Sequence, residues 1–156
     1  MNAVMKKAMR VVNALAVFLY RRSNGRIGGS AKGTRVLLLT VPGRKTGTPH
    51  TVPVSYFEHN GRYVVTGSAG GMKHDPQWIR NLQPAPRANI QIGAKQTEVE
   101  TRVTAATERD ELWRDVVIAR APFFARYEEK SGRVIPIAVL TPAHDEYPPG
   151  YGSANK

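Results

Sequence analysis

Six short segments rich in aliphatic and β-branched residues, separated by glycine, proline and asparagine, lie between residues 35 and 140. Segments of this length and composition are typical of β-strands. The strands are expected at about 35–41, 51–58, 62–67, 88–93, 96–104 and 134–140. Because few helical patterns interrupt them, the chain is predicted to be mainly β (α+β) and to form a barrel in place of a doubly wound sheet.

Local signals predict how some of these strands are connected. Asn60-Gly61 is a strong signal for a tight hairpin, and Gly93-Ala94-Lys95 provides a second turn. Pro53 interrupts its segment. Because proline cannot donate a backbone hydrogen bond, Pro53 is expected at a sheet edge or a bulge.

Short helices are expected beside the strands. Asp75 is a candidate N-cap with Pro76 at the first helical position. A longer helix is expected to start at Thr107, where 107–110 resembles a capping box, and to end at Pro122. A further short helix is expected at 122–130. The inward-facing residues of the longer helix are expected to be Leu112, Trp113, Val116 and Val117.

The positive charge of the chain is concentrated near its beginning. The 156 residues carry a net charge of +11, and the first 57 hold ten Lys and Arg with no Asp or Glu. Such a surface suits an anionic partner, whether nucleic acid, a membrane or a polyanionic cofactor tail. Nucleic acid is the least expected, because the sequence has no RNP aromatic pattern, zinc-finger spacing or helix-turn-helix pattern.

Residues 3–20 show the spacing of an amphipathic helix. Two interpretations remain open: the apolar stripe packs on the protein's own barrel, or residues 3–22 lie on an anionic membrane surface. The apolar run 14–19 is too short to cross a bilayer, and no signal-peptide cleavage site follows it. The expected location is therefore the cytoplasm or the inner face of the membrane. The stripe consists of Val4, Ala8, Val11, Val12, Leu15, Phe18 and Leu19.

The chain is expected to have one barrel domain with an extension at each end. Residues 1–33 would form the helix and a Gly-rich linker, 34–142 the barrel, and 143–156 a disordered tail rich in proline and glycine. The length suffices for a single core. The sequence gives no prediction of the oligomeric state.

A basic turn, residues 41–47, follows the first strand. Arg44 can bind a phosphate or carboxylate through two parallel hydrogen bonds, Lys45 adds a point charge and Thr46 a neutral donor. Because the turn contains two glycines, several of its backbone N–H groups could point at the same anion. The order of residues differs from that of a P-loop, so a nucleoside triphosphatase is not expected.

A glycine-rich loop, residues 66–72, follows the third predicted strand. Its small side chains let a flat ring approach the backbone. Trp78 lies about one turn further on, either as a wall of a ligand site or as part of the core. An ordinary β-to-α turn is the alternative interpretation of the loop.

Four blocks occur in order along the middle and end of the chain: LLLTVPGRKTGTPHTVPV, RYVVTGSAGG, DPQWIRNLQPAP and RVIPIAVLTP. With these blocks the chain resembles the deazaflavin (F420)-dependent nitroreductase family of the actinobacterial flavin/deazaflavin oxidoreductases. The resemblance implies a split β-barrel of the FMN-binding-like kind. It also implies coenzyme F420, a deazaflavin with a phosphodiester and a polyglutamate tail, as the cofactor, with FMN as the alternative.

The resemblance further implies which residues bind the cofactor. Arg44 and Lys45 would hold the phosphate and the acidic tail, and the glycine-rich loop would pass along the ring. His50 stands where the family often has arginine, so the grip on the tail is expected to be looser or pH-sensitive. The implied cofactor-binding residues are Arg44, Lys45, Thr46, Gly47, His50, Pro53, Val54, Thr66, Gly67, Ser68, Ala69, Gly70, Gly71, Gln77, Trp78 and Asn81.

The implied activity is transfer of a hydride from reduced F420 to a planar apolar acceptor. A membrane quinone is the expected acceptor, and nitroaromatics would be adventitious. Ser68 and Tyr127 are the candidate catalytic residues, while Phe123 and Phe124 would line an apolar substrate pocket with Tyr127. Some relatives have tyrosine near the positions of Phe123 and Phe124. The phenylalanines of this chain therefore weaken the expectation of nitroreductase activity more than that of cofactor binding. Tyr127 could instead be a partly buried aromatic residue of an amphipathic helix.

Other chemistry has little support in the sequence. Cysteine is absent, which excludes disulfides and thiolate ligands. His59, His74 and His144 lack metal-ligand spacing, so no metal site is predicted. The remaining alternatives are a non-catalytic F420 carrier, an FMN-binding protein and, from another class, a basic nucleic-acid-binding module.

Overall fold

The computed structural model describes residues 3–143. Strands dominate its middle, and helices lie before, between and after them. In chain order the elements are α1 (Ala3–Ser23), β1 (Ser30–Ala31), β2 (Thr34–Pro42), β3 (Pro49–His59), β4 (Arg62–Thr66), the short 3-10 helix η1 (Ala69–Gly71), α2 (Gln77–Leu82), β5 (Arg87–Ile92), β6 (Lys95–Val103), α3 (Ala106–Leu112), the π-helical turn η2 (Trp113–Ile118), α4 (Phe124–Ser131) and β7 (Ile137–Pro142).

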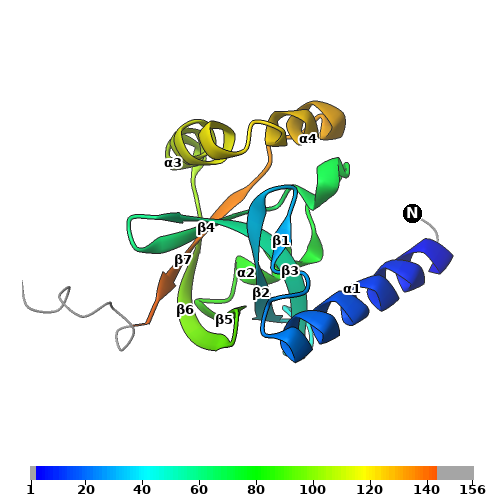
Figure 1. Ribbon diagram of the computed structural model, residues 1–156. Helices are drawn as coiled ribbons and strands as arrows, with labels where there is room; N and C mark the ends of the chain where they lie inside the picture. Colours follow the sequence, from blue (N-terminus) through cyan, green and yellow to red (C-terminus); the bar gives the residue numbers. More distant parts are fainter. Residues whose placement is uncertain (1–2, 144–156) are drawn as a thin grey trace, which may run out of the picture.

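Six antiparallel strands close into a barrel (Figure 1). Their order is β2-β3-β4-β7-β6-β5, and β5 pairs back with β2 to close the barrel. The closing register includes the pair Leu39↔Ile90. The short β1 pairs only with the start of β2. The predicted mainly β barrel is confirmed.

The predicted turns are confirmed as well. The register His59↔Arg62 leaves Asn60 and Gly61 as the two turn residues between β3 and β4. The register between β5 and β6 likewise leaves two residues, 93 and 94, between the strands. Pro53 pairs with β2, whereas β4 pairs with β3 only from Tyr56 onward. Pro53 therefore lies where one side of β3 has no neighbouring strand, as an edge proline requires.

β2 is apolar on both faces because both faces are covered. Successive side chains of a strand point to opposite sides. Leu37 and Leu39 belong to the core inside the barrel. Val36 and Leu38 pack on the outside against the C-terminal end of α1. The unbroken apolar run in the sequence reflects these two separate contacts.

A second layer of helices covers another outer face of the barrel. α3, η2 and α4 lie together over the sheet (Figure 1). Val116 and Val117, predicted to face inward, and Phe124 pack there against Phe57 and Ile137 of the sheet. This contact fixes α4 beside the end of β4, where the candidate site lies.

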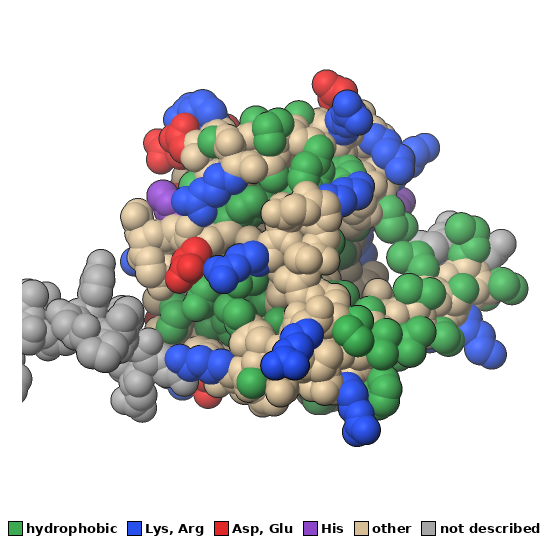
Figure 2. Space-filling model, in the orientation of Figure 1, with side chains coloured by type: hydrophobic (Ala, Val, Ile, Leu, Met, Phe, Trp, Pro, Cys, Tyr) green, Lys and Arg blue, Asp and Glu red, His purple; other side chains and the backbone are tan. Residues whose placement is uncertain are grey.

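In the described part of the chain, the C-terminal end of α1 packs on the barrel and the rest of the helix points away from it (Figure 1). Tyr20 is buried, its hydroxyl lies 3.1 Å from the Val36 carbonyl, and it accepts a hydrogen bond from Gly93 N–H at 3.0 Å. The rest of the helix extends outward, and green side chains follow it in Figure 2. Val4 is 77% exposed and Leu15 56%. The interpretation that the whole stripe packs on the barrel is therefore wrong.

Among residues 3–143, no helix is long and apolar enough to cross a membrane. The Gly-rich linker, expected to be a loop, contains β1. The predicted tail, 143–156, lies outside the described residues except for Ala143, whose N–H donates to the Glu98 carbonyl at 3.0 Å.

The capping box predicted at Thr107 is wrong. α3 begins at Ala106, and no side chain caps it. Glu108 instead pairs with Arg102 of β6, and the hydrogen bond from Arg102 holds the pKa of Glu108 below its ordinary value. The next helix, predicted from Pro122, begins two residues later.

The last strand starts three residues later than predicted, at Ile137. Pro136 has no N–H to donate. The Ile135 carbonyl accepts a hydrogen bond from Nε of the buried Arg109 at 2.8 Å. Arg109 also contacts Glu128 Oε2 at 3.0 Å. The segment before β7 thus ties α3 to α4 and is not part of the barrel.

Candidate active site

The basic turn is closed by its own backbone. Gly43 N–H donates to the Thr48 carbonyl and Gly47 N–H to the Gly43 carbonyl, both at 2.8 Å. Thr48 N–H donates to Thr46 Oγ1 at 3.3 Å. The N–H groups of Gly43, Gly47 and Thr48 therefore already have acceptors within the turn and do not point at an anion.

Arg44 is held by helix α2. Its Nη1 donates to Asn81 Oδ1 at 2.7 Å and to Gln77 Oε1 at 3.0 Å, and its backbone N–H donates to the same Asn81 oxygen at 3.2 Å. Asn81 is buried, so this acceptor is fixed in place. Within residues 3–143 the Nε and Nη2 atoms of this guanidinium donate to no other group, so they can bind an anion.

The other predicted anion ligands lie on the same loop. Lys45, Thr46 and Gly47 are exposed beside Arg44. The imidazole of His50 lies over Gly43, where a Cβ would come within 3.1 Å of Nε2. The structure therefore gathers these residues into one exposed, cationic surface.

The glycine-rich loop needs glycine at its first turn for close packing. A Cβ on Gly67 would lie 2.8 Å from both Ile79 Cγ1 and Pro136 Cγ. Real Cβ contacts are not that short, so glycine lets α2 and the segment before β7 approach the end of β4. The loop then turns through three residues with positive φ, Ala69 (47°), Gly70 (63°) and Gly71 (84°).

Arg133 holds the glycine-rich loop in place. Its Nη2 donates to the carbonyls of Gly67 (2.9 Å) and Ser68 (3.1 Å), and its Nε donates to that of Met72 (2.9 Å). Its Nη1 contacts Asp75 Oδ1 at 2.7 Å. Asp75, predicted to cap α2, therefore has an ion-pair partner instead, and α2 has no side-chain cap.

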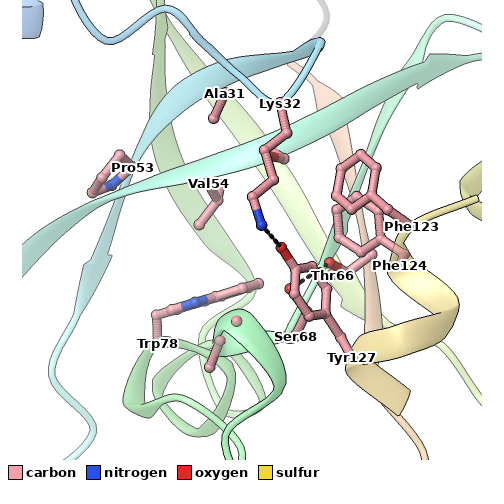
Figure 3. Close-up of a pocket in the computed structure, with 13 residues that line it drawn as sticks. Ala31, Lys32, Pro53, Val54, Thr66, Ser68, Trp78, Phe123, Phe124 and Tyr127 are labelled. Carbon is pink, nitrogen blue, oxygen red and sulfur yellow. Dashed lines mark hydrogen bonds between the residues drawn. The ribbon is translucent and has the colours of Figure 1, made fainter. Parts of the chain in front are cut away.

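A cavity of about 260 Å³ lies between these elements (Figure 3). β3, the glycine-rich loop, α2 and α4 each contribute to its wall. Of the predicted site residues it is lined by Pro53, Val54, Thr66, Ser68, Ala69, Gly70, Trp78, Phe123, Phe124 and Tyr127. Ala31, Lys32 and Ser55 also line it and were not predicted.

Aromatic side chains of α4 form one side of this cavity. Phe123 stacks on the buried Phe124 with ring centroids 4.8 Å apart, and Tyr127 meets Phe124 edge-on at 5.4 Å. The phenol of Tyr127 points toward the ammonium of Lys32, with 2.8 Å between the two atoms (Figure 3). Ser68 lies on the same cavity, and its Oγ accepts a hydrogen bond from Thr66 Oγ1 at 3.3 Å. The two predicted catalytic residues thus share one pocket.

Helix α2 connects the cavity to the basic turn. It places Trp78 in the cavity wall, while Gln77 and Asn81 hold Arg44. Trp78 is also part of the barrel core, so it packs in the core and lines the cavity at the same time. Gln77 and Asn81 do not line the cavity and act on Arg44.

Sequence reasoning missed Lys32 and Arg133. Lys32 and Gly33 are the two turn residues between the paired Ala31 and Thr34. The dipeptide Lys-Gly could have predicted a hairpin turn here, but not that Lys32 reaches the cavity. Arg133 follows the glycine that ends α4. No local pattern marks Arg133, because its partners lie about 60 residues earlier in the chain.

Comparison with known proteins gives a consistent result. Residues 12–142 match the F420H2-dependent quinone reductase family. An F420H2-dependent quinone reductase of Mycobacterium tuberculosis is 33% identical over 126 residues, which are 79% of this chain and 85% of the relative. A second, putative one from that species is 36% identical over 114 residues, which are 73% of this chain and 95% of the relative.

A solved structure supports the same assignment. An F420H2-dependent reductase (FDR-A) is 30% identical, with a TM-score of 0.60 over 67% of this chain and 92% of that one. The predicted split-barrel fold is thereby confirmed, together with the F420 cofactor and the oxidoreductase class. The chain belongs to the family of F420H2-dependent quinone reductases.

Proposed function

We propose that this protein reduces a quinone in the cavity between β3, the glycine-rich loop and α4, with the anionic tail of the cofactor on the basic turn. Reduced coenzyme F420 supplies the hydride when it is bound. The chain itself has to bind the tail, orient the rings, exclude water and provide a proton. The observation that carries the proposal is Arg44, which Asn81 and Gln77 fix beside the helix that places Trp78 in the cavity.

The residues present fit a ligand with a flat ring and an anionic tail. Pro53, Val54 and Trp78 offer apolar walls, and the volume of about 260 Å³ is near the lower end, about 300 Å³, of small-molecule pockets. The basic turn offers the Nε and Nη2 atoms of Arg44 and the ammonium of Lys45. Apolar walls next to an exposed cationic loop match a ring joined to phosphate and carboxylates.

The acceptor would occupy the α4 side of the cavity. Phe123 and Phe124 provide an apolar surface for a quinone ring. Ser68 and Tyr127 bring hydroxyl groups that can donate to an acceptor oxygen as negative charge develops on it. Nitroaromatic compounds would be reduced adventitiously at the same place.

The exposed helix α1 suggests how a lipid-soluble quinone reaches the cavity. Val4, Val11 and Leu15 are among its exposed apolar residues. Lys6, Lys7, Arg10, Arg21 and Arg22 accompany them with no acidic residue in the helix. We propose that residues 3–22 lie on an anionic membrane, at the inner face of the cell membrane, with cations at the headgroups.

Sedimentation with vesicles tests the membrane proposal. The protein is expected to sediment with vesicles containing phosphatidylglycerol and to remain in solution with phosphatidylcholine alone. Leu15→Asp places a charge on the exposed apolar face and is expected to abolish sedimentation. Equal sedimentation of this variant and the unmodified protein would contradict the proposal.

Titration with F420 tests the cofactor site. Hydrogen bonds to charged groups contribute about 1.5–3 kcal/mol each, so Arg44→Ala with Lys45→Ala should weaken F420 binding roughly 100-fold or more. Deazaflavin fluorescence measures the affinity. The matched control is Lys6→Ala with Lys7→Ala, which removes the same charge from α1. Equal affinities of the two double variants would refute the proposed site, and tighter binding of FMN than of F420 would refute the cofactor.

A further inference from the structure

Lys32 reaches across the mouth of the cavity from an unexpected element. It is a turn residue between β1 and β2 and has a positive φ of 50°. Its side chain extends toward α4 in Figure 3. Nζ lies 2.8 Å from the Tyr127 hydroxyl, 5.2 Å from the centroid of that ring and 5.7 Å from the centroid of Phe123.

The charge of Lys32 faces the cavity without a carboxylate beside it. Among the described residues that line the cavity, Lys32 is the only charged one. The nearest acidic neighbour of Tyr127 in sequence, Glu128, is engaged by Arg109 at 3.0 Å. Within residues 3–143, Lys32 forms no ion pair. An ammonium in this position attracts an anionic group that enters the cavity.

The hydrogen bond also determines what Tyr127 can do. An ammonium has only donors, so the phenol oxygen must be the acceptor in the contact with Lys32. The hydroxyl hydrogen of Tyr127 is then available to a ligand. The pair therefore presents a cation and a neutral donor at the same end of the cavity.

We infer that Lys32 and Tyr127 together form a binding site for an anionic oxygen on an aromatic ring, such as a phenolate. The inference rests on the proposed function, in which a quinone accepts a hydride in this cavity. Transfer of a hydride to a quinone gives the hydroquinone monoanion, whose anionic oxygen this site would bind. Tyr127 gives its proton to that oxygen, and the exposed ammonium of Lys32 replaces it across the 2.8 Å contact and recovers a proton from water.

Calorimetry with the cofactor-free protein tests the site. The probes are 4-nitrophenolate, at a pH where it is ionised, and its neutral methyl ether 4-nitroanisole. A charge-assisted hydrogen bond contributes about 1.5–3 kcal/mol, so the unmodified protein should bind the phenolate at least about tenfold more tightly than the ether. Lys32→Met should remove this preference and leave the affinity for the ether unchanged. Lys32→Arg should restore most of it, and the control Lys73→Met, at an exposed residue outside the cavity, should keep it.

Several outcomes would overturn the inference. The first is that the unmodified protein binds the phenolate no more tightly than the ether, or binds neither probe. The second is that Lys32→Met keeps the full preference for the phenolate. F420 binding by Lys32→Met should match that of the unmodified protein; weaker binding would place Lys32 at the cofactor and overturn the inference as well. If the unmodified protein fails to bind F420, the proposed function fails, while the phenolate measurement still decides about Lys32.

Discussion

Replacing Arg133 by alanine should loosen the glycine-rich loop and destabilise the protein. The two bonds from Nη2 to the carbonyls of Gly67 and Ser68 are the most protected from water, since Gly67 is buried. At about 1.5 kcal/mol each they contribute about 3 kcal/mol. The pair with Asp75, whose side chain is 37% exposed, adds only about 0.5–1 kcal/mol because solvent screens it. Arg133→Ala should therefore lower the free energy of unfolding by about 3–4 kcal/mol.

Urea unfolding followed by circular dichroism measures this loss. Asp75→Asn should cost only about 0.5–1 kcal/mol, because it leaves the carbonyl contacts intact. The matched control is Arg126→Ala, at an exposed residue of α4, which should change stability by no more than about 0.5 kcal/mol. Hydrogen exchange in the glycine-rich loop should become faster in Arg133→Ala alone. A loss below about 1 kcal/mol with unchanged exchange would refute the reasoning.

Three further predictions concern the barrel and its contacts. Gly67→Ala places a Cβ 2.8 Å from Ile79 and Pro136, so urea unfolding should show a loss of about 1–3 kcal/mol, and an unchanged midpoint would contradict the packing argument. Tyr20→Phe removes the buried hydroxyl that ties α1 to the barrel. The free energy of unfolding should fall by about 1–3 kcal/mol, and proteolysis within α1 should become faster. Equal cleavage rates in the variant and the unmodified protein would count against this role. Burial raises the pKa of Tyr56 above its ordinary value of 10.0, so this phenol ionises at lower pH in the unfolded chain than in the folded protein. The free energy of unfolding should therefore fall as the pH rises from about 10 through the folded pKa. In urea titrations at alkaline pH, Tyr56→Phe should show a shallower fall.

The sequence predicted the barrel because its strands and turns are encoded locally. Asn60-Gly61 sets the β3–β4 hairpin, and Pro53 lies at a one-sided part of β3, as a residue without an N–H must. The six strands were placed within about three residues of their observed starts. Periodicity of two and turn chemistry involve only neighbouring residues, so they can be read without a structure.

The candidate site was predictable in part. The basic turn and the glycine-rich loop carry their chemistry in contiguous residues, and the structure places most of the predicted pocket residues on one cavity. Three N–H groups at the basic turn, those of Gly43, Gly47 and Thr48, are unavailable for the predicted grip on an anion because they close the turn itself. Local composition shows which groups are present, but it does not show which of them already have partners.

Only the tertiary structure decided which distant groups meet. Lys32 and Tyr127 are 95 residues apart, Arg44 and Asn81 37, and Arg133 and Asp75 58. These contacts depend on closure of the barrel and on the position of α4, which no local pattern specifies. The same holds for α1, where periodicity predicts an apolar face but not what that face contacts. Local chemistry therefore determined the strands, the turns and the residue types of the basic turn and the glycine-rich loop, whereas closure of the barrel brought their side chains together.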